Sequence, residues 1–380
     1  HHPDHTYNLD RMMDGLKQGL DYYNDNYTPY QHRQARIIEF PKQYGSFAQA
    51  FANTIPFSER VGFIADVDEK KKDAVDYALA ITAHELAHQW WAHQVIGAKA
   101  KGMTLLSESM SEYSSLKVLE KVYGKNQMRK FLKESMEGYL SGRTGETIKE
   151  NPLMYNENQQ YIHYQKGSVV LYAMSDYLGE KKFNDVAKRF AEKYQFKSAP
   201  YPTAPEFVND IRAVTPDSLQ YLIKDMFETI TLYDNEVTDA TYSKVSDDQY
   251  LVNINSLVSK YRSYKKGKKS YSSISGDSLS FTPKDSKEAI SSLPLADYIE
   301  IGIFGEEDPE TGEEDVLYLK KLKITEIENN HSIMVSKKPI EVGIDPYYKL
   351  IDRRTSDNRK KVSETNNKDK EEAKHKEEEA

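Results

Sequence analysis

Apolar residues recur at helical spacing through most of the first 230 residues. Within residues 10–23, for example, Leu16 and Leu20 lie one turn apart on the apolar stripe of an amphipathic helix. Similar patterns, separated by glycine or proline, predict a largely helical first half with short strands near its start. The other expected helices cover residues 73–93, 106–122, 125–139, 159–178, 180–194, 204–214 and 218–227, and the expected strands cover 36–40 and 61–65.

The pattern changes after Leu232 to alternating apolar and polar positions. Residues 250–255, 298–304 and 316–320 alternate in this way, and glycine, aspartate and serine turns separate them. Alternation with period two is typical of strands that have one buried face. Several such strands in succession predict a β-sandwich domain over residues 232–352.

Very few apolar residues follow position 352. Only Val362, Ala373 and Ala380 are apolar there, and the charges alternate in blocks. A segment of this kind cannot bury enough apolar surface to offset the entropy of ordering it. We therefore expect residues 353–380 to form a disordered charged tail.

Composition narrows the possible functions. The 380 residues include 52 basic and 60 acidic side chains, giving a formal net charge of −8, which argues against a nucleic-acid partner because phosphate neutralisation needs a basic excess. No run of about 18 apolar residues occurs, so we expect no membrane span within this chain. Cysteine is absent, which excludes disulfides and leaves histidine and carboxylates as the ligands for any metal.

A metal-binding motif lies within the expected helix over residues 73–93. His84 and His88 are four residues apart, so both imidazoles lie on one face of a helix and can bind one cation. Glu85 follows His84 on the same turn. A catalytic zinc site needs a third protein ligand and an open position for water, and Glu108, after 19 intervening residues, is the candidate because an antiparallel helix pair returns it to the metal.

These residues belong to a longer pattern. His84 to Trp91 read HELAHQWW, Glu108 follows, and Tyr164 begins a Tyr-Gln-Lys-Gly segment. Together they resemble the aminopeptidase N family of zinc metallopeptidases, within the gluzincin clan. That family usually has 18 residues before its glutamate ligand, whereas 19 is the thermolysin spacing of the same clan. The HELAHQWWAHQ segment also resembles bacterial members that are fused downstream of a transporter-permease-like membrane region.

The resemblance implies the fold class and the metal. We expect an α+β chain with a thermolysin-like, mostly α-helical catalytic domain over residues 1–231, of which 1–66 are partly β, followed by the β-sandwich and the tail. The resemblance also implies one zinc ion per chain, held by His84, His88 and Glu108.

Further side chains receive roles from the resemblance. Glu85 is the expected general base, which takes a proton from water and passes it to the leaving amine. Tyr164 is expected to donate a hydrogen bond to the oxyanion that forms in the transition state. Glu59 stands near the expected position of the family's Gly-Ala-Met-Glu-Asn signature, where a carboxylate pairs with the free α-amino group of the substrate. Glu112, one helical turn beyond Glu108, is a candidate for orienting a zinc ligand.

The expected function is that of a zinc-dependent aminopeptidase that hydrolyses N-terminal residues from peptides. One alternative is a thermolysin-like zinc endopeptidase, because of the 19-residue spacing and the altered signature around Glu59. Another is a non-catalytic, peptidase-like module of a membrane assembly. We expect Trp90, Trp91 and His163 to be packed structural side chains. Membrane attachment is expected only through segments upstream of His1, and a cytoplasmic location is expected without them.

Overall fold

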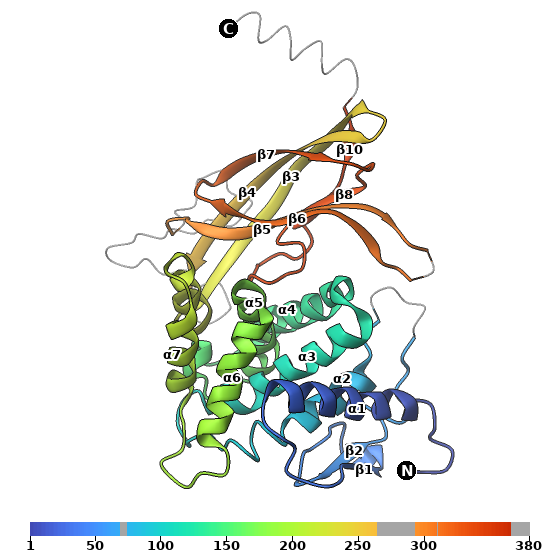
Figure 1. The fold of residues 1–380 in the computed structure, drawn as a ribbon, viewed down its shortest axis with the longest axis vertical. Helices are drawn as coiled ribbons and strands as arrows, with labels where there is room; N and C mark the ends of the chain where they lie inside the picture. Colours follow the sequence, from blue (N-terminus) through green and yellow to red (C-terminus); the bar gives the residue numbers. More distant parts are fainter. Residues whose placement is uncertain (69–73, 264–292, 310, 366–380) are drawn as a thin grey trace, which may run out of the picture. The chain divides into compact units, whose positions relative to one another are not determined.

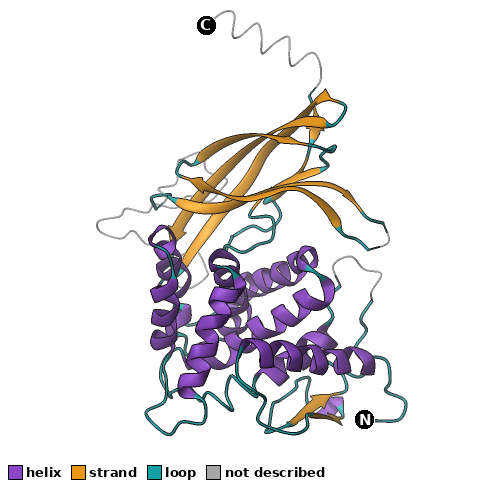
Figure 2. Ribbon diagram, in the orientation of Figure 1, coloured by secondary structure: helices purple, strands orange, loops and turns teal. Residues whose placement is uncertain are grey.

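The structure is a computed structural model that describes residues 1–68, 74–263, 293–309 and 311–365. It divides into two compact units. The first is built on His1–Thr231 and is mostly helical, and the second begins at Leu232 and is mostly strands (Figure 1, Figure 2). The expectation of a chain with mixed helices and sheets is therefore confirmed.

Three helices surround the metal-binding motif. They are α1 (Leu9–Asn26), α2 (Tyr77–Ala87) and α3 (Met110–Tyr123). Helix α2 packs against both of the others and is buried along most of its length. The close approach of α1 depends on Gly19, because a Cβ atom there would lie 2.8 Å from Leu86 Cδ2. This packing fixes the orientation of the helix that carries His84.

The remaining helical segments complete the first unit. The α-helices are α4 (Met128–Gly145), α5 (Gly167–Leu178), α6 (Glu180–Tyr194), α7 (Ala204–Val214) and α8 (Gln220–Ile223). The 3₁₀ turns are η1 (Lys42–Tyr44), η3 (Lys125–Gln127), η4 (Leu153–Tyr155) and η6 (Asp217–Leu219). The π-helical segments, in which the backbone bonds span five residues, are η2 (Leu105–Ser109), η5 (Tyr161–Lys166) and η7 (Lys224–Glu228).

Helix α2 is shorter than the expected helix over residues 73–93. It begins after Asp76, whose side chain accepts a hydrogen bond of 2.9 Å from the backbone N–H of Leu79. It ends at Ala87, and Ala92 has a φ of 151°, which no helix accommodates. His88 is therefore the first residue beyond the helix, although its N–H still bonds to the carbonyl oxygen of His84.

A parallel pair of strands lies beside the helices. Strand β1 (Arg36–Phe40) has the expected bounds, but its partner is β2 (Thr54–Ser58), and the expected strand over residues 61–65 is wrong. Those residues form turns in which the N–H of Gly62 bonds to the carbonyl oxygen of Ser58. Their apolar side chains contribute to the core without strand pairing, as the buried side chain of Phe63 shows.

The second unit contains two four-stranded sheets with the orders β10-β3-β4-β7 and β6-β5-β8-β9. Alternate residues of β4 are buried, among them Val252, Ile254 and Val258. The strands are β3 (Thr231–Ser246), β4 (Gln249–Arg262), β5 (Asp297–Glu307), β6 (Glu314–Ile324), β7 (Glu328–Val335), β8 (Glu341–Ile344), β9 (Arg359–Lys361) and β10 (Ser363–Glu364).

The prediction of a disordered tail over residues 353–380 is wrong for its first part, which contains two short strands. Within residues 353–365, strand β9 pairs with β8 and strand β10 pairs with β3. Arg359 also contacts the carboxylates of Glu314 and Glu341. Strand pairing uses backbone groups, so a charged segment can extend a sheet without contributing to a core. Residues 366–380 lie outside the described residues.

No described helix is both long enough and apolar enough to cross a lipid bilayer.

Candidate metal centre and active site

Helix α2, the residue that directly follows it and segment η2 bring three ligand atoms together. Glu108 Oε2 lies 3.4 Å from His84 Nε2 and 3.3 Å from His88 Nε2. Two atoms that bind one tetrahedral zinc ion at bond lengths of about 2.0–2.2 Å lie roughly 3.3–3.6 Å apart. In the part of the chain that the structure describes, Glu108 Oε2 is also buried without a hydrogen-bond partner. The donor set and its spacing therefore fit a zinc ion.

The opposite nitrogen of each histidine ring has its own partner. His84 Nδ1 lies 3.0 Å from Glu112 Oε1, and His88 Nδ1 lies 3.0 Å from both Trp91 O and Ser111 Oγ. Carboxylate and carbonyl partners of this kind fix ring orientation in protein metal sites. They direct both Nε2 atoms toward Glu108. Glu112 thus occupies the orienting position for which it was a candidate.

The electrostatic environment of Glu108 suits a metal ligand. Burial acts to raise the pKa of Glu108, but the facing rings of His84 and His88 lower it by more, to well below its usual range. Glu108 is therefore ionised at neutral pH, as a carboxylate ligand must be.

Glu85 lines the same pocket as His84. Its Oε2 atom is buried and has no hydrogen-bond partner among the described residues. Burial raises the pKa of Glu85, although the neighbouring histidines oppose the shift. A buried carboxylate with a raised pKa and a free oxygen is suited to receive a proton.

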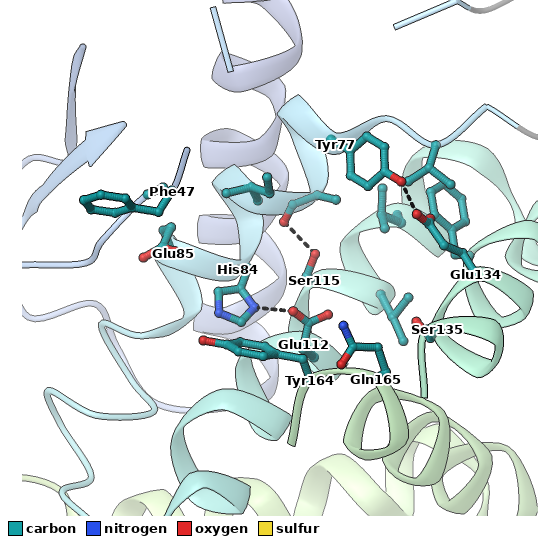
Figure 3. A pocket seen from close by; sticks show the side chains of 18 residues that line it. Phe47, Tyr77, His84, Glu85, Glu112, Ser115, Glu134, Ser135, Tyr164 and Gln165 are labelled. Atoms are coloured by element: carbon teal, nitrogen blue, oxygen red, sulfur yellow. Dashed lines mark hydrogen bonds and ion pairs between the residues drawn. The ribbon is translucent and has the colours of Figure 1, made fainter. Parts of the chain in front are cut away.

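Tyr164 reaches the metal centre from η5. Its ring centroid lies 5.9 Å from that of His84 (Figure 3), and the carboxylate of Glu108 acts with burial to raise the pKa of its phenol. Burial raises the pKa of Tyr164 well above its ordinary value, so the phenol keeps its proton and remains a donor. His163 packs against this ring with centroids 4.5 Å apart.

The three side chains that we expected to be structural are buried. Trp90 and Trp91 are both fully buried. Burial lowers the pKa of His163 to about 4, and its Nδ1 lies 2.9 Å from Asn156 Nδ2. The neutral His163 ring therefore acts as a packed support beneath Tyr164.

A cavity of about 420 Å³ opens beside the metal centre (Figure 3). Residues of α2, α3, α4 and η5 form most of its wall, and Phe47 and Ala48 contribute from the segment before β2. The sequence did not predict a role for these two residues, because the apolar residues of 43–60 recur at neither helical nor strand spacing. In the structure, the N–H of Ser58 bonds to the carbonyl oxygen of Phe47. The segment that contains Phe47 therefore lies alongside β2 and is hydrogen-bonded to it.

Glu59 is not among the residues that line this cavity. It follows β2 directly, and its Oε2 atom lies 3.8 Å from His5 Nδ1, near Glu39. The structure thus brings together five of the six predicted site residues, namely His84, Glu85, His88, Glu108 and Tyr164. It gives Glu59 other neighbours, and its predicted role with the substrate amine draws no support from this placement.

These features define a class of protein. A helix-borne His-Glu-x-x-His motif, a distant glutamate ligand and a tyrosine on the same cavity are the arrangement of a zinc metallopeptidase. Residues 11–230 match the Peptidase family M1 domain, which is more than half of the chain. The chain belongs to peptidase family M1.

Several known proteins are similar to parts of this chain. Endoplasmic reticulum aminopeptidase 1 of Rattus norvegicus is 26% identical over 210 residues, covering 52% of this chain and 22% of that protein. Probable aminopeptidase 2 of Sulfurisphaera tokodaii is 25% identical over 221 residues, covering 56% of this chain and 27% of that protein. The chain thus spans about a quarter of the length of these relatives.

A solved structure shares the fold. The crystal structure of Legionella pneumophila aminopeptidase A in complex with aspartic acid aligns with a TM-score of 0.52 at 15% identity. The alignment covers 96% of this chain and 36% of that chain.

Proposed function

We propose that this chain is the catalytic part of a zinc-dependent aminopeptidase that releases N-terminal residues from peptides. The observation that carries the proposal is the convergence of His84 Nε2, His88 Nε2 and Glu108 Oε2 at spacings that suit one zinc ion. Glu85 and Tyr164 line the same cavity. The names of the family relatives, which are aminopeptidases, support the choice of an exopeptidase.

Each side chain has a definite task in this reaction. His84, His88 and Glu108 would hold the zinc ion, which would supply Lewis acidity to lower the pKa of a water molecule toward neutrality and to polarise the scissile carbonyl. Glu85 accepts the proton of that water and transfers it to the nitrogen of the departing amine. The phenol of Tyr164 donates a hydrogen bond to the carbonyl oxygen as negative charge develops on it.

The cavity has room for a substrate side chain next to the scissile bond. Ile81, Leu116 and Phe131 contribute apolar walls, and Tyr77 and Glu134, joined by a hydrogen bond, also line it (Figure 3). Apolar walls with a few placed polar groups are typical of small-molecule and peptide subsites.

A thermolysin-like endopeptidase is the second candidate. It is favoured by the position of Glu59, which lies outside the cavity beside His5. Without a carboxylate that pairs with the substrate amine, the site would accept internal peptide bonds as well as terminal ones.

The experiment that separates these functions compares free-amine and N-acetylated peptides. Both sets are offered to protein that has been stripped of metal and to protein restored with one equivalent of zinc. Zinc-dependent hydrolysis of the free-amine set alone supports an aminopeptidase. Equal rates for both sets support the endopeptidase. Stoichiometric zinc with no hydrolysis of either set would overturn both and favour a non-catalytic module.

We expect the substitution Glu85→Gln to abolish most of the hydrolysis while leaving zinc binding intact. The amide keeps the shape of the side chain but cannot accept the proton of water, and loss of a general base typically costs about 10²–10⁴ in rate. The measurements are kcat/KM and metal content of the same preparation. Residual activity within about twofold of the parent protein would refute the assignment of Glu85.

A further inference from the structure

A carboxylate that the proposed reaction does not use lies in the wall of the active-site cavity. Glu134, on α4, lines this cavity and is half-buried. Among the described residues, the other carboxylates of the lining are Glu85, the candidate base, and Glu112, the partner of His84. Building on the proposed peptidase function, we propose that Glu134 makes the cavity selective for peptides with a lysine or arginine next to the scissile bond.

Two helices place Glu134 where a long substrate side chain would end. Tyr77, Ile81 and His84 line the cavity from α2. Tyr77 precedes His84 by two helical turns, which is about 10 Å along the helix axis. The hydroxyl of Tyr77 donates a hydrogen bond to Glu134, and Figure 3 shows this pair on the opposite side of the view from Glu85. An unbranched side chain such as that of lysine suits this separation from the metal centre.

The polar groups of the cavity favour a ligand that donates hydrogen bonds. Tyr77 donates to Oε1 of Glu134, and no described residue donates to its Oε2. Gln165 Oε1 is buried and has no hydrogen-bond partner among the described residues. The described lining contains no lysine or arginine. An ammonium or guanidinium group brings several N–H donors and a positive charge, so it matches these acceptors.

The lysines near Glu134 do not supply its counterion. Lys130 and Lys133 lie on the same helix and line a neighbouring pocket together with Glu134. Lys133, however, pairs with Glu137, and Lys130 lies over the ring of Phe131. Burial raises the pKa of Glu134, and nearby carboxylates act in the same direction. A cationic substrate group would offset both effects.

The apolar part of the cavity suits the stem of such a side chain. Ile81 and Leu116 line it, and lysine and arginine bury their methylene groups along apolar surfaces of this kind. The rings of Tyr77 and Phe131 also line it, and aromatic faces attract cations. Apolar walls together with the carboxylate of Glu134 therefore match both ends of a long basic side chain.

Hydrolysis of a peptide panel by the zinc-loaded chain tests the proposal. Alanine hexapeptides carry lysine, arginine, norleucine or glutamate at the first or the second position, and mass spectrometry of the products gives kcat/KM for each. Norleucine keeps the unbranched stem of lysine without its charge. We expect lysine and arginine to be preferred over norleucine by at least about 10-fold at one of the two positions, because hydrogen bonds to charged groups are the stronger ones.

Three variants separate the charge of Glu134 from its structural contact. Glu134→Gln should lower the lysine-to-norleucine ratio of kcat/KM by at least about 10-fold, although its amide oxygen still accepts the hydrogen bond from Tyr77. Glu134→Lys should shift the preference to the glutamate peptide. Glu137→Gln is the matched control, because Glu137 lies on the same helix but does not line the cavity, and it should keep the parent ratio.

A binding measurement distinguishes failure of this inference from failure of the proposed function. In zinc-loaded Glu85→Gln protein, calorimetry should show the lysine peptide binding at least about 10-fold more tightly than the norleucine peptide, and adding Glu134→Gln should remove the difference. Hydrolysis without a basic preference, or with one that survives Glu134→Gln, would overturn the role of Glu134 and leave the peptidase function standing. Absence of all hydrolysis would overturn that function, and equal binding of both peptides would then overturn this inference as well.

Discussion

At the residue scale, the candidate zinc centre depends on side chains that do not touch the metal position. His84 and His88 can direct their Nε2 atoms to one point because Glu112 and Ser111 occupy the opposite sides of the rings. These partners lie on α3, immediately beyond the segment that supplies Glu108. The second chain segment thus contributes a ligand and also orients the ligands of the first.

Replacing Glu112 by alanine should weaken zinc binding by about 10- to 100-fold, because His84 loses the carboxylate that fixes its ring. Glu112→Gln should lose less affinity, because its amide oxygen can still accept the Nδ1 proton. The measurement is a chelator competition at fixed pH. Glu157→Ala is the control, since its surface ion pair with Lys101 lies outside the cavity lining. Equal zinc affinity in Glu112→Ala and the parent protein would exclude the orienting role.

At the element scale, two π-helical segments join the zinc ligands to the catalytic tyrosine candidate. Ser109, at the end of η2, donates to the carbonyl oxygen of His163 in η5 at 2.7 Å. Gly167 follows η5 and packs directly against Ser109. Glu108 and Tyr164 therefore lie on two elements that are held together by this hydrogen bond and by the close packing of Gly167 on Ser109.

Gly167→Ala should destabilise the first unit and reduce activity. A Cβ atom at this position would lie 2.2 Å from Ser109 Oγ and 2.7 Å from Ser109 Cβ, so η2 and η5 must move apart. Overpacking of this kind typically costs about 1–3 kcal/mol. The measurement is the free energy of unfolding in denaturant, together with kcat/KM.

Gly145→Ala is the matched control for this substitution. A Cβ atom at Gly145, at the end of α4, meets nothing within 4 Å. We expect its unfolding free energy to stay within about 0.5 kcal/mol of the parent protein. The packing argument fails if both alanine variants behave alike.

Sequence predicted some elements better than others for a physical reason. Helices α6 and α7 have the expected bounds, because their signals are local. Thr203 and Glu206, for example, form a capping box at the start of α7. The strand expected over residues 61–65 required a partner that no local pattern could supply, and β2 pairs with β1 instead.

At the scale of the whole molecule, the second unit contains a titratable group that couples its folding to pH. Asp352 is fully buried and accepts hydrogen bonds from the N–H groups of Asn235 and Arg354. Burial raises the pKa of Asp352 to about 7, and the nearby carboxylates of Asp234 and Asp357 act in the same direction. Its ordinary value is 3.8.

This shift predicts the sign of a pH dependence. Between pH 3.8 and about 7 the folded state holds a proton that the unfolded state releases, so the contribution of Asp352 to stability falls as pH rises through this window. Asp352→Asn should flatten that part of the profile. The measurement is the free energy of unfolding at a series of pH values, with the exposed Asp247→Asn as control. An unchanged slope in Asp352→Asn would contradict the prediction.

The sequence alone determined the chemistry of the candidate active site. Residue type and spacing identify His84, Glu85 and His88 because four residues make one helical turn. Glu108 could be proposed because a helix pair brings a later carboxylate back to the same point. Tyr164 depended on its Tyr-x-Lys-Gly context, since the chain has 28 tyrosines.

Only the tertiary structure decided which other side chains meet. Phe47 lines the cavity although the apolar residues around it follow neither helical nor strand spacing. Glu59 lies close to His5 and Glu39 and does not line the cavity. Strands β9 and β10 join their sheets through backbone pairing that side-chain composition does not reveal. Local patterns are set by neighbours a few residues apart, whereas these contacts depend on how distant segments pack.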